Sequence, residues 1–203
     1  MAKKFIILDT ETTGLEVRQG HKIIEIGAVV LNDRKKSSDH FHAYINPGRA
    51  IDEEASKVHG ISNQDLENEP MFAAIADDFI EFIQGSTLII HNAPFDVGFL
   101  NSELKSVSAK YPKLEDICEI EDSLVLARNK FPGQRNSLDA LANRFEVSGY
   151  DRSFHGALLD ANILADVYIY LTGGQSKFEF LDNTSTLNKN QHDKESHLSL
   201  EGL

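Results

Sequence analysis

The sequence has little cysteine, no long apolar run and no excess of basic charge. Cys118 is the single cysteine, which excludes an internal disulfide and favours an intracellular protein. No signal-like segment precedes Phe5, and no apolar stretch approaches the roughly 20 residues of a membrane-spanning helix, so we expect a cytoplasmic protein without a membrane partner. Lys and Arg number 20 against 32 Asp and Glu, a net charge of −12. This balance argues against strong autonomous binding to a polyanion, because such affinity comes largely from Lys and Arg.

Two acidic residues, Asp9 and Glu11, follow an apolar run at residues 5–8. Side chains two apart on a strand point to the same face, so we expect two carboxyl groups side by side where a buried strand reaches solvent. Unless a cation is shared, one carboxyl should keep its proton. The pair therefore predicts a coupled acid/base dyad or a divalent-metal site, although it can also simply solubilise a strand end beside Thr12-Thr13-Gly14.

A third acid follows a second apolar run, at residues 87–90. Pro94 suits a first helical position, which places Asp96 in the first turn of the next helix. Aspartate is common in first turns for dipole reasons alone, so Asp96 has a structural interpretation as well. His91, just after the strand, either lines the same cleft or makes a loop hydrogen bond, and we favour the loop bond.

A fourth acid, Asp160, lies in a helical pattern at residues 156–172 that ends at Gly173-Gly174. Five residues turn an α-helix by about 140°, so His155 and Asp160 do not share a helical face. If the two side chains converge, His155 lies in the loop or cap before the helix, with Asp160 inside it.

The acids Asp9, Glu11, Asp96 and Asp160, with His155 just before the last, resemble the DEDDh group of 3′-to-5′ exonucleases. Within it, the chain is similar to the DnaQ-like family, the proofreading epsilon subunits of bacterial DNA polymerase III. The resemblance runs from about Phe5 to Phe180 and is carried by LDTETTG, GHKIIEIGAV, VHGI, IHNAPFDVGF, FPGQRNSLDALANRF and HGALLDANILADVY. Their order and spacing are the specific signal. A related branch has Tyr near the position of His155, so the His indicates the DEDDh subgroup.

The resemblance implies two divalent metal ions, Mg²⁺ or Mn²⁺, which suits a cluster of Asp and Glu without Cys. Asp9 would bridge both ions, with Glu11, Asp96 and Asp160 completing the set. His155 would accept a proton from the attacking water, since its unperturbed pKa near 6.5 suits a general base.

The resemblance also implies residues that bind the substrate. Glu54 and His59, in EEASKVHGIS, would contact the terminal nucleotide. Glu11 and the backbone at Thr10 and Thr12 would receive the 3′-terminal sugar, although a Thr-Thr-Gly turn has a structural explanation too.

The predicted fold is α/β: a ribonuclease H-like mixed central β-sheet flanked by α-helices, without internal repeats. Early strands are expected at 4–8, 23–31 and 40–45, with turns at Asn32-Asp33 and Ser37-Ser38. An amphipathic helix is expected at 71–84, then a strand at Thr87, a helix at Asp96 and a short strand near Ile117. Further helices are expected at 122–130, 137–145 and 156–172.

Three segments are predicted along the chain: an exonuclease domain at 1–174, a short motif at 175–180 and a polar, flexible tail at 181–203. The motif resembles the sliding-clamp-binding peptide of the family, with Gln175 making polar contacts and Phe178 and Phe180 as apolar anchors. Alternatively, both Phe residues pack onto the domain. The family's longer C-terminal segment binds the polymerase alpha subunit, and the few residues after Phe180 put that attachment in doubt.

The function implied is removal of nucleotides from DNA 3′ ends by two-metal-ion hydrolysis, as a proofreading subunit. The implied partners are a single-stranded or frayed DNA 3′ end, the DNA polymerase III alpha subunit and the sliding clamp, with a small accessory subunit left open. Because of the acidic charge, we expect another protein to hold the DNA. An RNA-trimming enzyme of the oligoribonuclease or ribonuclease T type is the alternative within the group, and the clamp-like motif favours DNA. A non-catalytic adaptor is the alternative outside it, against which the intact acids argue.

Overall fold

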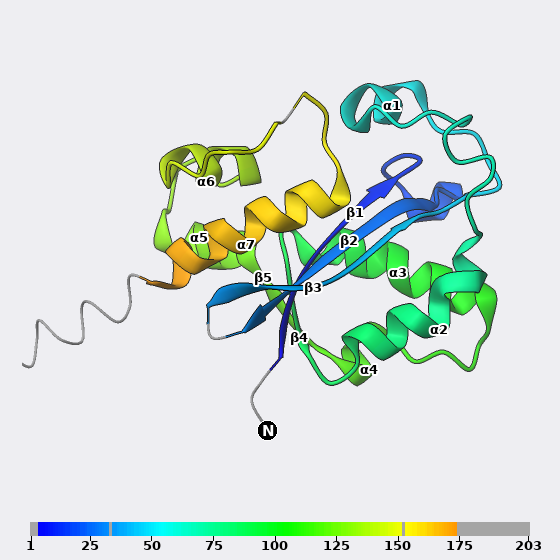
Figure 1. Cartoon of the computed structure of the whole chain (residues 1–203), viewed down its shortest axis with the longest axis horizontal. Helices are drawn as coiled ribbons and strands as arrows, with labels where there is room; N and C mark the ends of the chain where they lie inside the picture. The colour runs from blue at the N-terminus through cyan, green and yellow to red at the C-terminus, as the bar shows by residue number, and fades with distance from the viewer. Residues whose placement is uncertain (1–3, 33, 152, 174–203) are drawn as a thin grey trace, which may run out of the picture.

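The computed structural model describes residues 4–32, 34–151 and 153–173 (Figure 1). The motif at 175–180, with Gln175, Phe178 and Phe180, and the tail at 181–203 lie outside the described residues. The five strands are β1 (Phe5–Thr12), β2 (Ile23–Asn32), β3 (Lys35–Tyr44), β4 (Thr87–Ile90) and β5 (Glu119–Asp122). The helices are η1 (Val17–Gln19), α1 (Glu53–His59), α2 (Phe72–Ile83), α3 (Ala93–Val107), α4 (Leu114–Ile117), α5 (Ser123–Lys130), α6 (Leu138–Arg144) and α7 (Ala157–Gly173). None of these helices is both long enough and apolar enough to span a membrane.

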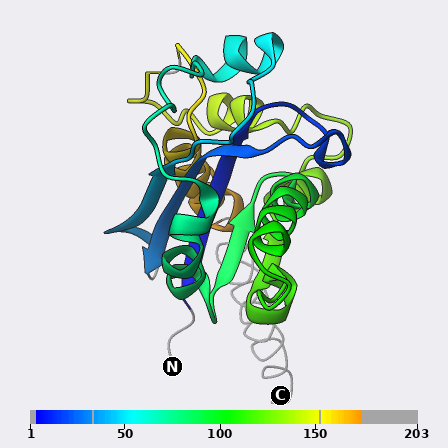
Figure 2. The same cartoon turned by 90° about the vertical axis from the view of Figure 1, so that its right-hand side faces the viewer.

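The strands form one mixed sheet in the order β3-β2-β1-β4-β5. β1 and β3 each pair antiparallel with β2, whereas β4 runs parallel to both β1 and β5. Helices cover both faces, as Figure 2 shows from the side, with α2 and α3 away from α7. The predicted mixed sheet flanked by helices is therefore confirmed.

Alternate side chains of β1 pack on opposite faces of this sheet. Ile6 and Leu8 pack with α2 and α3, around the buried Phe79 and Phe99. Ile7 packs on the other face, against Ala161, Leu164 and Ala165 of α7. Because side chains alternate along a strand, Asp9 and Glu11 belong to the α7 face and Thr10 to the α3 face. This alternation determines which helix lies beside Asp9 and Glu11 and which lies beside Thr10, and therefore which helix carries each of the other acids to the site.

Four expectations about local structure were incomplete or wrong. β1 continues to Thr12, so Asp9 and Glu11 lie within a paired strand, and Glu11 lies opposite Glu25 of β2. β3 begins at Lys35, so Ser37-Ser38 does not separate two elements; the two serines lie where the β2–β3 register shifts, between the pairs Leu31–Lys36 and Val29–His40. Near Ile117 the chain forms α4 before β5 begins. Helix α1 was not expected.

Candidate active site

Three carboxyl groups converge at the end of β1. Asp9, Glu11 and Asp160 each offer one oxygen, and these three oxygens lie within 4.8 Å of one another. The first two project from β1 toward α7, and Asp160 lies in the first turn of α7. Strand parity and helix position thus place side chains about 150 residues apart in one group.

Asp96 reaches the same region from the other face of the sheet. It lies in the first turn of α3, which begins shortly after β4, and it is 3% exposed. Its Oδ1 accepts a 2.7 Å hydrogen bond from Thr10 Oγ1. Asp96 is not a member of the 4.8 Å group, but its charge is the strongest of those that raise the pKa of Asp9.

Burial and mutual repulsion keep protons on this acidic group in the absence of a cation. Burial, followed by the charges of Asp96 and Glu11, raises the pKa of Asp9 well above its ordinary value. Burial, followed by the charge of Glu25, raises the pKa of Glu11 to about 8. Burial also raises the pKa of Asp96 to about 7, against the opposing hydrogen bond from Thr10. A bound cation would release these protons, so the group favours cation binding.

His155 lies in the loop before α7, as predicted. Its Nδ1 is 2.8 Å from Asp160 Oδ2, with the imidazole 40% exposed and the carboxyl 7%. The His155 N–H donates to Val58 O at 3.1 Å, which ties this loop to α1. A carboxylate partner at Nδ1 favours the tautomer with its proton on Nδ1, in which Nε2 carries the lone pair.

Of the two residues expected at the terminal nucleotide, His59 is buried and Glu54 is exposed. His59 Nδ1 accepts from the Ile61 N–H at 3.1 Å. Its Nε2 is buried and, among the described residues, has no hydrogen-bond partner. Burial lowers the pKa of His59 below its ordinary value, so the ring is neutral at pH 7. An unpaired buried nitrogen is costly unless a ligand supplies its partner.

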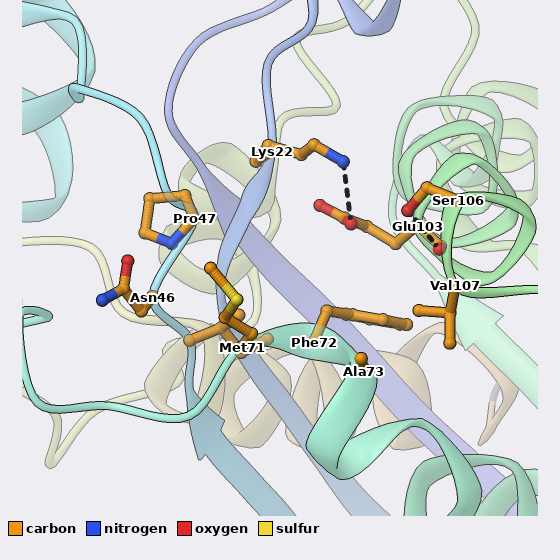
Figure 3. Close-up of a pocket in the computed structure, with 10 residues that line it drawn as sticks. Lys22, Asn46, Pro47, Met71, Phe72, Ala73, Glu103, Ser106 and Val107 are labelled. Atoms are coloured by element: carbon orange, nitrogen blue, oxygen red, sulfur yellow. Dashed lines mark hydrogen bonds and ion pairs between the residues drawn. The ribbon is translucent and has the colours of Figure 1, made fainter.

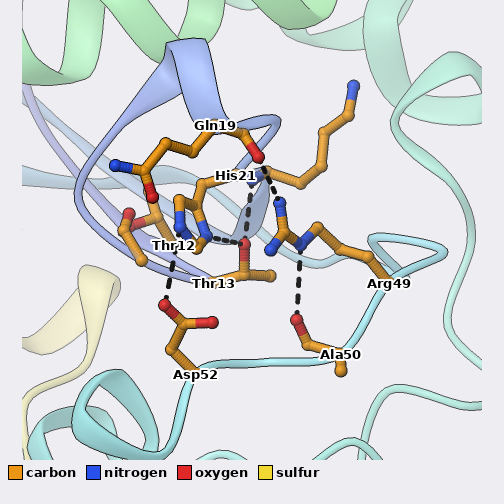
Figure 4. Close-up of polar contacts among 9 residues, drawn as sticks. Thr12, Thr13, Gln19, His21, Arg49, Ala50 and Asp52 are labelled. Atoms are coloured by element: carbon orange, nitrogen blue, oxygen red, sulfur yellow. Dashed lines mark hydrogen bonds and ion pairs between the residues drawn. The ribbon is translucent and has the colours of Figure 1, made fainter.

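The turn after β1 is anchored to the segment that leads into α1 (Figure 4). Thr13 Oγ1 lies 3.0 Å from Nδ1 of the buried His21, and the Thr13 carbonyl accepts the Asp52 N–H at 3.0 Å. His21 Nε2 in turn lies 3.5 Å from Asp52 Oδ2. The hydroxyl of Thr12 donates to the Gly14 carbonyl at 2.7 Å. The hydroxyls of Thr10 and Thr12 are therefore both engaged within the protein.

Two other features are separate from the acidic group. A cavity of about 360 Å³ is lined by Lys22, Met71, Phe72 and Glu103, with no member of the acidic group (Figure 3). His91 lies 2.9 Å from both Ser123 Oγ and the Asn136 carbonyl, as the loop hydrogen bond favoured from the sequence.

One acid beside the site was missed in the sequence. Glu25 of β2 is 2% exposed and lies opposite Glu11. The sequence contains a sign of this residue's importance, since Glu25 interrupts an otherwise apolar run from Ile23 to Leu31. A buried charged residue in such a run needs partners, and only the tertiary structure shows which ones it has.

Comparison with known proteins connects this geometry to a family. A family model described as Exonuclease (RNase_T) matches residues 6–168. The chain is 53% identical to the DNA polymerase III subunit epsilon of Rickettsia typhi over 184 residues, covering 90% of this chain and 80% of that protein. It is 49% identical to the same subunit of Escherichia coli K12 over 179 residues, covering 86% and 74% respectively.

Solved structures agree on the fold. Exonuclease X in complex with 5′ overhanging duplex DNA superposes with a TM-score of 0.67 at 26% identity, covering 85% of this chain and 93% of that one. The nuclease domain of 3′hExo, a DEDDh family member bound to rAMP, gives 0.71 at 20% identity over 85% and 92% of the two chains. The chain is thus a 3′-to-5′ exonuclease and belongs to the family of DNA polymerase III epsilon subunits.

Proposed function

We propose that this exonuclease removes nucleotides from DNA 3′ ends as the proofreading subunit of DNA polymerase III, using Asp9, Glu11, Asp96, His155 and Asp160. The observation that carries the proposal is the convergence of three carboxyl oxygens within 4.8 Å, with His155 Nδ1 2.8 Å from Asp160. It places a candidate cation site and a candidate base side by side, which are the two requirements for hydrolysing a phosphodiester.

The donor set fits hard divalent cations. The contributing groups are carboxyl oxygens, and burial, followed by neighbouring negative charges, raises the pKa values of Asp9, Glu11 and Asp96. Asp9, Glu11, Asp96 and Asp160 would hold Mg²⁺ or Mn²⁺. When bound, two such ions would neutralise charge on the scissile phosphate and on the leaving oxygen and would make the attacking water more acidic.

His155 acts as the general base in this proposal. Asp160 would accept a hydrogen bond from Nδ1–H and fix the ring, with Nε2 as the nitrogen that takes the proton of the attacking water. The 40% exposure of the imidazole allows the ring to meet a substrate and then return its proton to solvent.

The 3′-terminal nucleotide is bound beside these groups. His59 supports this placement, because it is a buried polar residue of α1, the helix whose Val58 carbonyl accepts the His155 N–H, and its Nε2 makes no hydrogen bond of good geometry among the described residues. Glu54, exposed in the first turn of the same helix α1, would contact the nucleotide from solvent. Glu11 and the backbone of Thr10 and Thr12 would receive the terminal sugar.

Mismatched ends are preferred without any reading of bases. Seating a 3′ end beside buried carboxyl groups requires the last base pairs to open, at roughly 1.4 kcal/mol per step. Three steps would cost about 4 kcal/mol, close to a thousandfold in occupancy, and a mismatch has already lost part of this stability. Equal rates on matched and mismatched primers, without polymerase, would contradict this expectation.

The proposed partners follow from charge and from the C-terminal motif. A net charge of −12 disfavours autonomous DNA binding, so the polymerase alpha subunit would hold the primer and raise its effective concentration to the millimolar range. Within the proposed division into 1–174, 175–180 and 181–203, Gln175, Phe178 and Phe180 would dock on the sliding clamp. A small accessory subunit stays an open partner, and the proposed location is the cytoplasm.

Primer digestion tests the function directly. A 3′-mismatched DNA primer and an RNA oligomer of the same sequence are incubated with wild-type protein and with Asp9→Ala, each with Mg²⁺, Mn²⁺ or EDTA. We expect metal-dependent loss of 3′ nucleotides from DNA by the wild-type protein only. Preference for RNA would indicate an RNA-trimming enzyme instead, and cleavage of neither would favour the adaptor.

A further inference from the structure

Helix α7 carries Asp160 and follows His155, so the position of its first turn decides where both side chains lie. The first N–H groups of a helix have no partner within the helix and need acceptors from elsewhere. The Ala157 N–H donates to Glu25 Oε2 of β2 at 3.1 Å. Glu25 is 132 positions earlier in the chain and 2% exposed, so the sheet itself supplies this acceptor.

Gly27, two residues further along β2, lets the helix approach. A Cβ at Gly27 would lie 2.1 Å from Leu158 N and 2.3 Å from the Ala157 carbonyl carbon. These are backbone atoms, so any larger residue would push the start of α7 away from the sheet. Gly27 pairs with Asp9, and Glu25 pairs with Glu11. The two contacts to α7 therefore lie directly beside the two carboxyl groups of β1.

The second carboxyl oxygen of Glu25 is also engaged. His42 Nε2, from β3, lies 2.8 Å from Glu25 Oε1. Glu25 is thus held from both sides, by β3 at one oxygen and by the start of α7 at the other. A side chain with both oxygens bonded and 2% exposure has one available geometry, which it imposes on the helix.

We infer that Glu25 and Gly27 form a seat for α7, and that Glu25 is a positioning residue for the nuclease reaction. The seat fixes the first turn of α7 so that His155 and Asp160 meet Asp9 and Glu11. This inference rests on the roles proposed above for those four residues. It adds one requirement to those roles: the length of the Glu25 side chain matters for turnover. A misplacement of the catalytic groups by about 1 Å can lower the rate about a hundredfold.

Two substitutions at Glu25 separate geometry from charge. Glu25→Gln keeps the length and an oxygen that accepts from Ala157, while its amide donates to His42 in the other tautomer. Glu25→Asp keeps the charge but is shorter by one carbon–carbon bond, roughly 1.5 Å, so it cannot reach both partners. Glu103→Gln and Glu103→Asp are matched controls, since Glu103 is buried and accepts the Ile23 N–H at 3.2 Å but lies on α3.

The experiment combines primer digestion at saturating metal with amide hydrogen exchange at Ala157. We expect Glu25→Asp to lower kcat tenfold or more with KM within threefold, and to speed exchange at Ala157. Glu25→Gln should keep Ala157 exchange within threefold of wild type, since it keeps the acceptor for the Ala157 N–H, and should lose less kcat than Glu25→Asp, although it removes a charge that acts on Glu11. The Glu103 variants should leave kcat and Ala157 exchange unchanged.

Three results would overturn the seat. Glu25→Asp could have the kcat of the wild type, or its Ala157 amide could exchange at the wild-type rate. The third is a loss of kcat in Glu25→Gln as large as that in Glu25→Asp. Exchange needs no activity, so it tests the seat even if the wild-type protein cleaves nothing. If Glu25→Asp does not fold, Gly27→Ala decides, because its Cβ would lie 2.1 Å from Leu158 N: a tenfold loss of kcat with faster Ala157 exchange supports the seat, and wild-type values of both refute it.

Discussion

Replacing Asp9 with asparagine should stabilise the metal-free protein and abolish its response to divalent cations. In the folded protein the pKa of Glu11 is about 8 against an ordinary value of 4.5. A folded-state pKa above the unfolded one means that the folded protein binds the proton more tightly. This contribution to stability is fully present below pH 4.5 and is lost as the pH rises through 8. The difference corresponds to about 5 kcal/mol for Glu11 acting alone. Burial and the charges of Asp96 and Glu11 raise the pKa of Asp9 in the same direction, so ionised Asp9 also destabilises the metal-free protein as the pH rises.

A divalent cation should reverse this loss. At a hundred times its dissociation constant, a ligand that binds only the folded state adds about 2.7 kcal/mol to the free energy of unfolding. For a domain of this size each kcal/mol moves Tm by roughly 2–4 °C, so the expected rise is about 5–11 °C. Because protons compete with the cation for the same oxygens, the rise should be larger at pH 8 than at pH 6.

The assay is thermal unfolding at pH 6 and pH 8 with EDTA, Mg²⁺ or Mn²⁺. Asp9→Asn removes one of the crowded charges, so we expect a higher Tm in EDTA at pH 8 and no rise with metal. Asp39→Asn, on the exposed edge strand β3, is the control and should behave as wild type. If neither metal raises the Tm of the wild-type protein at pH 8, the proposed cation site is wrong.

Three further predictions concern single side chains. His155→Ala should lower kcat by about 10²–10⁴-fold while the metal-dependent rise in Tm persists, and a loss of that rise would show instead that His155 shapes the cation site. His59→Ala should raise KM for a primer about five- to tenfold, the worth of about one hydrogen bond, with a smaller change in kcat; steady-state kinetics with the reverse pattern would contradict it. Phe79 lies in the core between α2 and the sheet, so Phe79→Ala should lower the free energy of unfolding by about 3–5 kcal/mol, measured by urea titration. A loss below 1 kcal/mol would mean that the core collapses around the cavity left by the ring.

Periodic patterns were sufficient where a segment buries one face. The apolar stripe at 71–84 predicted α2, because burial of a regular face outweighs other local preferences. The strand at 23–31 was predicted instead from a nearly continuous apolar run, and β2 is buried on both faces. The structure of polar segments was harder to predict from the sequence. Within β3 the strand at 40–45 was expected, but Ser37-Ser38 was expected as a turn, and the strand in fact begins earlier, at Lys35.

The sequence by itself determined the chemistry available to this protein. The parity of Asp9 and Glu11 on β1 follows from the two-residue period of a strand, and the separation of His155 from Asp160 follows from the pitch of a helix. The order of the motifs was specific enough to indicate the exonuclease family from the sequence alone.

The tertiary structure decided how these groups meet. Asp96 and Asp160 approach β1 from opposite faces of the sheet, and no local pattern specifies that convergence. The raised pKa values, the unpaired His59 Nε2 and the contact between Glu25 and Ala157 all depend on burial and on neighbours distant in the chain. The local periodicity of the sequence determines which face of a strand or helix a side chain occupies. Long-range packing alone determines which residues lie opposite that side chain.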